Sequence, residues 1–165
     1  MNNPLFSTRK ICFFALVAHC VACVAVVNAQ ENIVNKADTD RAFELSRSDW
    51  EASTRSFALP EGWTLRILPF ESGSAVAAFD KNTGIGLQIQ PMYRDGYPFP
   101  EMLIVGSWYP VGVLPVSQET YEGSSFKKRI EAGAREDLGL DYSFSTVFQH
   151  APPYDGIMFM IRKNK

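Results

Sequence analysis

The chain has 165 residues, of which 46% are hydrophobic and 21% are charged, and its formal net charge is −2. This length fits a single globular domain. Nucleic acids and anionic membranes require a concentrated basic face, and an acidic chain lacks the charge for one. The only basic run, Lys127 to Arg129, falls in a predicted helix, where it is expected to face water. We therefore expect neither nucleic acid nor a membrane surface as the partner.

The N-terminal segment has the three parts of a secretory signal peptide. Arg9 and Lys10 are followed by the apolar run from Ile11 to Val27, and Val27-Asn28-Ala29 places small residues at a cleavage position. We predict cleavage after Ala29 and a periplasmic or secreted protein. Two alternatives remain open, namely an uncleaved N-terminal membrane anchor and a lipoprotein cleaved before Cys23.

All three cysteines, Cys12, Cys20 and Cys23, lie inside this leader. Cleavage would leave residues 30–165 without a thiol and with 14 basic residues against 18 acidic ones, a net charge of −4. Such a chain folds in an oxidising compartment without disulfides, which favours a bacterial exported protein over a eukaryotic one. No membrane insertion of the mature chain is expected.

Residues 30–37 are polar and are predicted to be a flexible segment, with a single domain over 38–165. Residues 38–53 contain no Gly or Pro and predict a peripheral helix. Phe126, Ile130, Ala134 and Leu138 recur at helical spacing and predict a second, longer helix that ends at Gly139. Apolar alternation or short apolar runs between turn signals predict strands near 63–67, 75–80, 85–90, 102–109, 142–149 and 157–161.

The order of these elements predicts the fold class. Short turns between the first strands favour an antiparallel meander, and the run Ile157 to Ile161 is typical of a central strand. We expect a single α+β domain in which an antiparallel sheet of about six strands packs against one long helix, with a peripheral N-terminal helix.

Residue types that support catalysis or metal binding are scarce after the leader. His150 is the only histidine there, so a Cys–His pair and a His/Cys zinc site are both excluded. No Gly-x-Ser-x-Gly turn supports a serine nucleophile, and we interpret His150 as an exposed turn residue. A calcium loop starting at Asp80 would need glutamate where Pro91 stands. We therefore expect no catalytic residue, metal or cofactor.

An aromatic and proline-rich segment offers the candidate binding residues. Large rigid rings with polar tips dominate binding hot spots, and prolines stiffen the loops that carry them. Alternatively, these rings close one end of the core. The candidate partner-binding residues are Tyr93, Arg94, Tyr97, Phe99, Trp108 and Tyr109.

Three functions follow from these observations. The first is an exported, non-catalytic binding module that recognises another protein, as an inhibitor, an immunity-type protein or an accessory subunit does. The second is a periplasmic carrier that holds an apolar or aromatic small molecule between helix and sheet. The third is a hydrolase that uses His150 or a pair of carboxylates.

Overall fold

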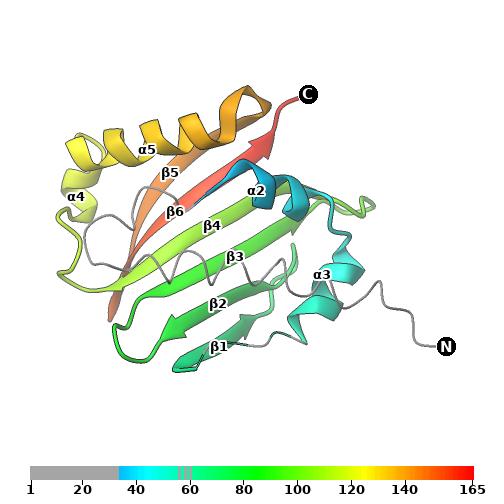
Figure 1. The fold of residues 1–165 in the computed structure, drawn as a ribbon, viewed down its shortest axis with the longest axis horizontal. Coiled ribbons are helices and arrows are strands. Elements are labelled where there is room, and N and C mark those ends of the chain that lie inside the picture. Colours follow the sequence, from blue (N-terminus) through cyan, green and yellow to red (C-terminus); the bar gives the residue numbers. More distant parts are fainter. Residues whose placement is uncertain (1–33, 56, 58, 60) are drawn as a thin grey trace.

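The protein is a single α+β domain built on a six-stranded antiparallel sheet (Figure 1). The computed structural model describes residues 34–55, 57, 59 and 61–165. The predicted signal peptide and its cleavage site lie outside these described residues. The expected fold class, a single α+β domain with an antiparallel sheet of about six strands, is confirmed.

The sheet combines a four-stranded meander with a hairpin. The strands are β1 (Trp63–Leu68), β2 (Ala75–Asp80), β3 (Gly86–Tyr93), β4 (Pro100–Pro110), β5 (Tyr142–Ala151) and β6 (Tyr154–Lys163). Their order is β1-β2-β3-β4-β6-β5, so β6 lies between β4 and β5. All neighbouring strands are antiparallel, as short connections between consecutive strands require.

The helices are α2 (Lys36–Phe43), α3 (Arg47–Thr54), α4 (Gln118–Tyr121) and α5 (Ser125–Leu138), followed by the 3₁₀ turn η1 (Gly139–Asp141). In the described part of the chain they all lie on one face of the sheet (Figure 1). α5 runs beside β5, whereas α2 crosses β4.

The turn between β2 and β3 forms because Asp80 binds its own loop. Its carboxylate accepts the backbone N–H of Asn82 at 3.0 Å and the hydroxyl of Thr83 at 2.8 Å. These bonds favour the charged form and lower the pKa of Asp80. Gly84 follows with φ of 72°, a conformation that glycine adopts without strain. The turn is therefore a self-contained hairpin connection.

α5 confirms its predicted register. Ser124 caps the helix by accepting the N–H of Lys127 at 3.0 Å, and the buried side is formed by Phe126, Ile130, Ala134 and Leu138. Gly139 ends it with φ of 66°, where a Cβ would be strained.

The predicted helix over residues 38–53 is two helices. α2 ends at Phe43, and Ser46 caps α3 by accepting the N–H of Asp49 at 3.1 Å. A serine with an acidic residue three positions later is a start signal, and it interrupts a pattern that otherwise reads as continuous. α3 is also anchored, because Trp50 is only 1% exposed and its indole N–H donates to the carbonyl of Ser74.

A cluster of polar contacts fixes α2 to η1 and to the start of β5. Lys36 pairs with Asp40 at 2.9 Å and with Asp141 of η1 at 2.8 Å. The hydroxyl of Tyr142 donates to Asp40 at 2.5 Å, and its ring packs against Phe43. This cluster ties the start of the domain to the start of β5.

Candidate binding surface

The two faces of the sheet differ in what lies on them. The helix-covered face, named here the covered face, carries the large branched and aromatic side chains of the core. Phe148 of β5 packs against Tyr121 of α4, and Thr146 donates to Glu131 of α5 at 2.6 Å. The opposite face, named here the open face, carries the alternate residues of each strand.

The open face is apolar at its centre. Glutamines and serines surround this centre, and the only charged side chains at the open-face positions of the six described strands are Arg66 and Arg162. No Asp or Glu stands at a paired open-face position of these described strands, although the chain contains 18 acidic residues; Glu101 is exposed at the bulge beside Met102 and has no partner in the register. The central residues are Phe79, Met92, Met102, Ile104, Trp108, Tyr154, Met158 and Met160.

Glycines let the large side chains of this face lie flat. Trp108 stands in register with Gly86 on one neighbouring strand and with Gly156 on the other. A Cβ on Gly156 would lie 2.7 Å from the indole of Trp108, and one on Gly86 would lie 2.4 Å from the ring of Phe79. Each ring therefore covers the backbone of the adjacent strand, as aromatic side chains do beside sheet glycines. The rings of Trp108 and Phe79 therefore lie flat against the sheet rather than projecting from it.

A hydrogen bond, a ring–ring contact and a cation–π contact hold these flat-lying rings in place. The indole N–H of Trp108 donates to the side-chain oxygen of Gln88 at 2.9 Å. Phe79 contacts the ring of Tyr154 with centroids 5.2 Å apart, and the guanidinium of Arg66 lies 5.3 Å from the Phe79 centroid. Three aromatic rings from three strands thus gather at one end of the open face, with Arg66 at their margin.

Two of the six predicted binding residues belong to the core. Tyr93 is 4% exposed and its hydroxyl donates to the carbonyl of Leu45, whereas Tyr109 is 8% exposed. Burial raises the pKa of Tyr93 well above its ordinary value. Arg47 stacks on the Tyr93 ring. Both tyrosines therefore lie in the core of the covered face, and Tyr93 ties that face to the segment that joins α2 and α3.

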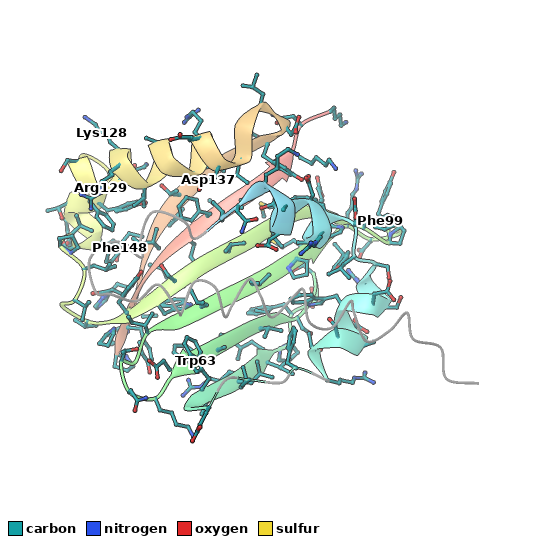
Figure 2. The ribbon with its side chains drawn as sticks, viewed as in Figure 1. Trp63, Phe99, Lys128, Arg129, Asp137 and Phe148 are labelled. Atoms are coloured by element: carbon teal, nitrogen blue, oxygen red, sulfur yellow. The ribbon has the colours of Figure 1, made fainter. Side chains whose placement is uncertain are left out.

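The other four residues are accessible in two places. Arg94, Tyr97 and Phe99 lie in the loop between β3 and β4, where Tyr97 is 62% and Phe99 is 52% exposed. Arg94 stacks on the ring of Tyr97. Figure 2 shows Phe99 at the outer end of this hairpin, far from Lys128 on α5. Trp108 lies farther along β4 on the open face, so the six residues do not form one patch.

His150 occupies the end of β5, where its side chain is 45% exposed. Its Nδ1 lies 2.7 Å from a carboxylate oxygen of Asp155, which is 9% exposed on β6. The second oxygen of Asp155 faces the N–H of Gly112 at 3.4 Å, and Val111 donates to the carbonyl of Pro153. Asp155 thus connects the loop after β4 with His150 at the end of β5, and the bond from Val111 to Pro153 joins the same loop to the turn between β5 and β6.

Sequence reasoning missed the methionines and the paired glycines. The sequence places Gly86 and Met102 in predicted strands and Met92 and Gly156 outside them, and it assigns no role to any of the four. One signal was available, because Met158 and Met160 share a side of one strand. The rest required the strand register, since a glycine gains this meaning only beside a large neighbour on another strand.

The described residues contain no group of three or more His, Cys, Asp or Glu side chains placed to hold a metal ion. Within the same residues, no helix is long and apolar enough to span a membrane. Comparisons with protein-family models, with curated proteins and with solved structures found no match.

Proposed function

We propose that this protein is an exported, non-catalytic binding module that recognises another protein through the open face of its sheet. The observation that carries the proposal is the composition of that face. Its strands present an apolar centre and no carboxylate at a paired position, in a chain whose net charge is negative. An apolar surface with a polar margin is typical of a protein interface.

The kinds of side chain support a protein partner. Trp108 and Tyr154 are of the types that concentrate binding energy, and both are half-buried in the free protein. Methionines adapt their shape to an uneven partner surface at low cost. Tyr97 and Phe99 extend the same chemistry to the adjacent hairpin tip.

The predicted signal peptide is the basis for the proposed location of the protein. A signal peptide cleaved after Ala29 would deliver a thiol-free chain to the periplasm or the exterior, where the partner would be met. The proposal keeps the uncleaved anchor as its alternative form, with the same open face presented outside the membrane.

The test is site-specific photo-crosslinking in the exporting cell. A photoreactive amino acid replaces Ile104, which is half-buried at the centre of the open face. We expect a discrete adduct with one envelope or secreted protein, identified by mass spectrometry. The hairpin variant Tyr97→Ala, Phe99→Ala in the same background is expected to reduce its yield.

The matched control carries the photoreactive residue at Lys128, which is exposed on the outer side of α5 (Figure 2). An adduct from Lys128 of equal yield, or none from Ile104, would contradict the proposal. The charged variant Ile104→Arg, folded by circular dichroism, is expected to lose the partner. Retention by that variant would move recognition elsewhere.

The pairing of His150 with Asp155 favours a hydrolase as the second candidate. A carboxylate only accepts hydrogen bonds, so it orients the imidazole with Nδ1 as donor and leaves Nε2 as a potential base. This arrangement supports general-base chemistry without supplying a nucleophile. Turnover of chromogenic esters, phosphodiesters or glycosides that is abolished by His150→Ala in a folded protein would establish this function instead.

A further inference from the structure

The soft metal ligands of the described chain are concentrated on the open face. After Met1, the chain has four methionines, Met92, Met102, Met158 and Met160, and all stand at open-face positions of three adjacent strands. The covered face is instead filled by branched and aromatic residues. Thioether sulfur is a soft ligand that selects Cu(I) and similar monovalent ions.

The strand register brings three of these side chains together. Met92 of β3 is the direct cross-strand partner of Met102 of β4. Met160 of β6 pairs with Ile104 and is therefore the diagonal neighbour of Met102 on the same face. Direct cross-strand neighbours have Cβ atoms about 5 Å apart and diagonal ones about 7–8 Å, within reach of long side chains.

Met158 differs from the other three. It is 6% exposed, and a Cβ added to Gly106 would lie 2.1 Å from its sulfur. Its thioether is therefore turned down onto the backbone of β4 and fills the space that the glycine leaves. Met92, Met102 and Met160 are half-buried, so their side chains retain contact with solvent.

We propose that Met92, Met102 and Met160 form a thioether site for a soft monovalent cation, Cu(I) or Ag(I). The ligand set distinguishes between classes of metal. Hard divalent ions such as Mg²⁺ and Ca²⁺ require several oxygen ligands, and no paired open-face position of the described strands carries a carboxylate. Neutral sulfur ligands remain sufficient for a monovalent soft ion.

The positive charge of a neighbouring arginine provides a further test of this site. Leu103 pairs with Ile161, so Arg162 stands opposite Met102 at the next position along the strands. Arg162 is the charged residue paired with the strand positions at this end of the open face, and its guanidinium opposes a bound cation. Replacement of Arg162 by Gln should therefore tighten binding.

The experiment titrates Ag(I), a redox-inert probe, into the full chain with Cys12, Cys20 and Cys23 replaced by Ser, so that no thiol competes. Calorimetry and native mass spectrometry measure affinity and stoichiometry. We expect one tightly bound Ag(I) per chain. The triple variant Met92→Leu, Met102→Leu, Met160→Leu should weaken binding by about 100-fold, because leucine keeps the volume and removes the sulfur.

Met158→Leu is the matched control and should retain the wild-type affinity. Equal loss in Met158→Leu, or retention in the triple variant, would overturn the proposal, as would the absence of stoichiometric binding. Mg²⁺ and Zn²⁺ titrated in the same way should not compete. Because the leucine variants keep an apolar open face, their crosslinking from Ile104 tests the protein partner separately.

Discussion

Asp40 shows how a single carboxylate holds α2 on the domain. The hydrogen bond from Tyr142 and the contact with Lys36 stabilise its charged form and lower its pKa below the ordinary value of 3.8. The contacts with Asp141 and then with Asp40 raise the pKa of Lys36, whereas burial and then the bond to Asp40 raise that of Tyr142. The stabilisation that Asp40 supplies is therefore present above about pH 4 and is lost as pH falls through its lowered pKa.

Asp40→Asn should consequently lower stability at pH 7 by about 1 kcal/mol or less, because the pair is partly exposed. The difference from wild type should shrink as the pH falls below about 4 and close once the pH is below the lowered pKa of Asp40, where the folded wild type is protonated as well. Thermal unfolding at pH 7, 5 and 3 measures this. Asp95→Asn, in the exposed loop after β3, is the control. A difference that stays constant down to pH 3 would show that Asp40 acts through packing alone.

The same scale shows why the candidate site was only partly predictable. Adjacent residues of a strand face opposite ways, so the sequence alone already separates Trp108 from Tyr109. Which of the two faces the helices depends on the pairing of β4 with β3 and β6, which no local pattern contains. Tyr93 lies in the core, where its hydroxyl donates to the carbonyl of Leu45, 48 positions away in sequence. A contact between such distant residues leaves no signal in the local sequence.

At the scale of elements, α3 depends on one buried side chain. Trp50 contacts the ring of Phe57 and donates to Ser74 at the start of β2, which ties a short helix to the edge of the meander. An eight-residue helix is marginal without such tertiary contacts.

Trp50→Phe should keep much of the apolar volume and remove the hydrogen bond, leaving the carbonyl of Ser74 without this donor. We expect a loss of about 1–3 kcal/mol in the free energy of unfolding. Trp63→Phe, on the half-buried edge strand β1, should cost less and serves as the comparison. Urea unfolding of both variants measures the difference, and equal losses would remove the special role assigned to the Ser74 contact.

The elements themselves were largely predictable because their signals are local. The alternation of apolar and polar residues predicted the strands. The helical spacing of apolar residues predicted α5, with Ser124 and Gly139 at its ends and Phe126, Ile130, Ala134 and Leu138 on its buried side. The break at Ser46 was missed because its small polar side chain fitted the helical pattern as well as a cap. The apolar run of β6 correctly indicated a central strand, but its neighbours β4 and β5 were not predictable, since strand order is set by pairing between distant segments.

At the scale of the whole molecule, the open face behaves as a second packed layer one side chain thick. Gly156→Ala tests this, because its new Cβ would meet the indole of Trp108 at 2.7 Å. Trp108 would have to move and give up its bond to Gln88. We expect a loss of about 1–3 kcal/mol and a change in tryptophan fluorescence.

Gly123→Ala is the control for that experiment, because a Cβ there would meet nothing within 4 Å. It should leave both stability and fluorescence near their wild-type values. If Gly156→Ala matched Gly123→Ala in both measurements, the indole of Trp108 would not lie against Gly156 of β6. The conclusion that the rings of the open face lie flat on the sheet would then be wrong.

The place of β6 in the sheet has a consequence for how the protein acquires its shape. β6 follows every other strand along the chain, yet it supplies the only sheet partner of β5 and closes the free edge of β4. While a nascent chain grows through α5 and β5, the meander ends in an unpaired edge and β5 has no strand to join. Completion of the sheet therefore waits for one segment. Until that segment emerges, the edge of β4 stays unpaired and open to chaperones.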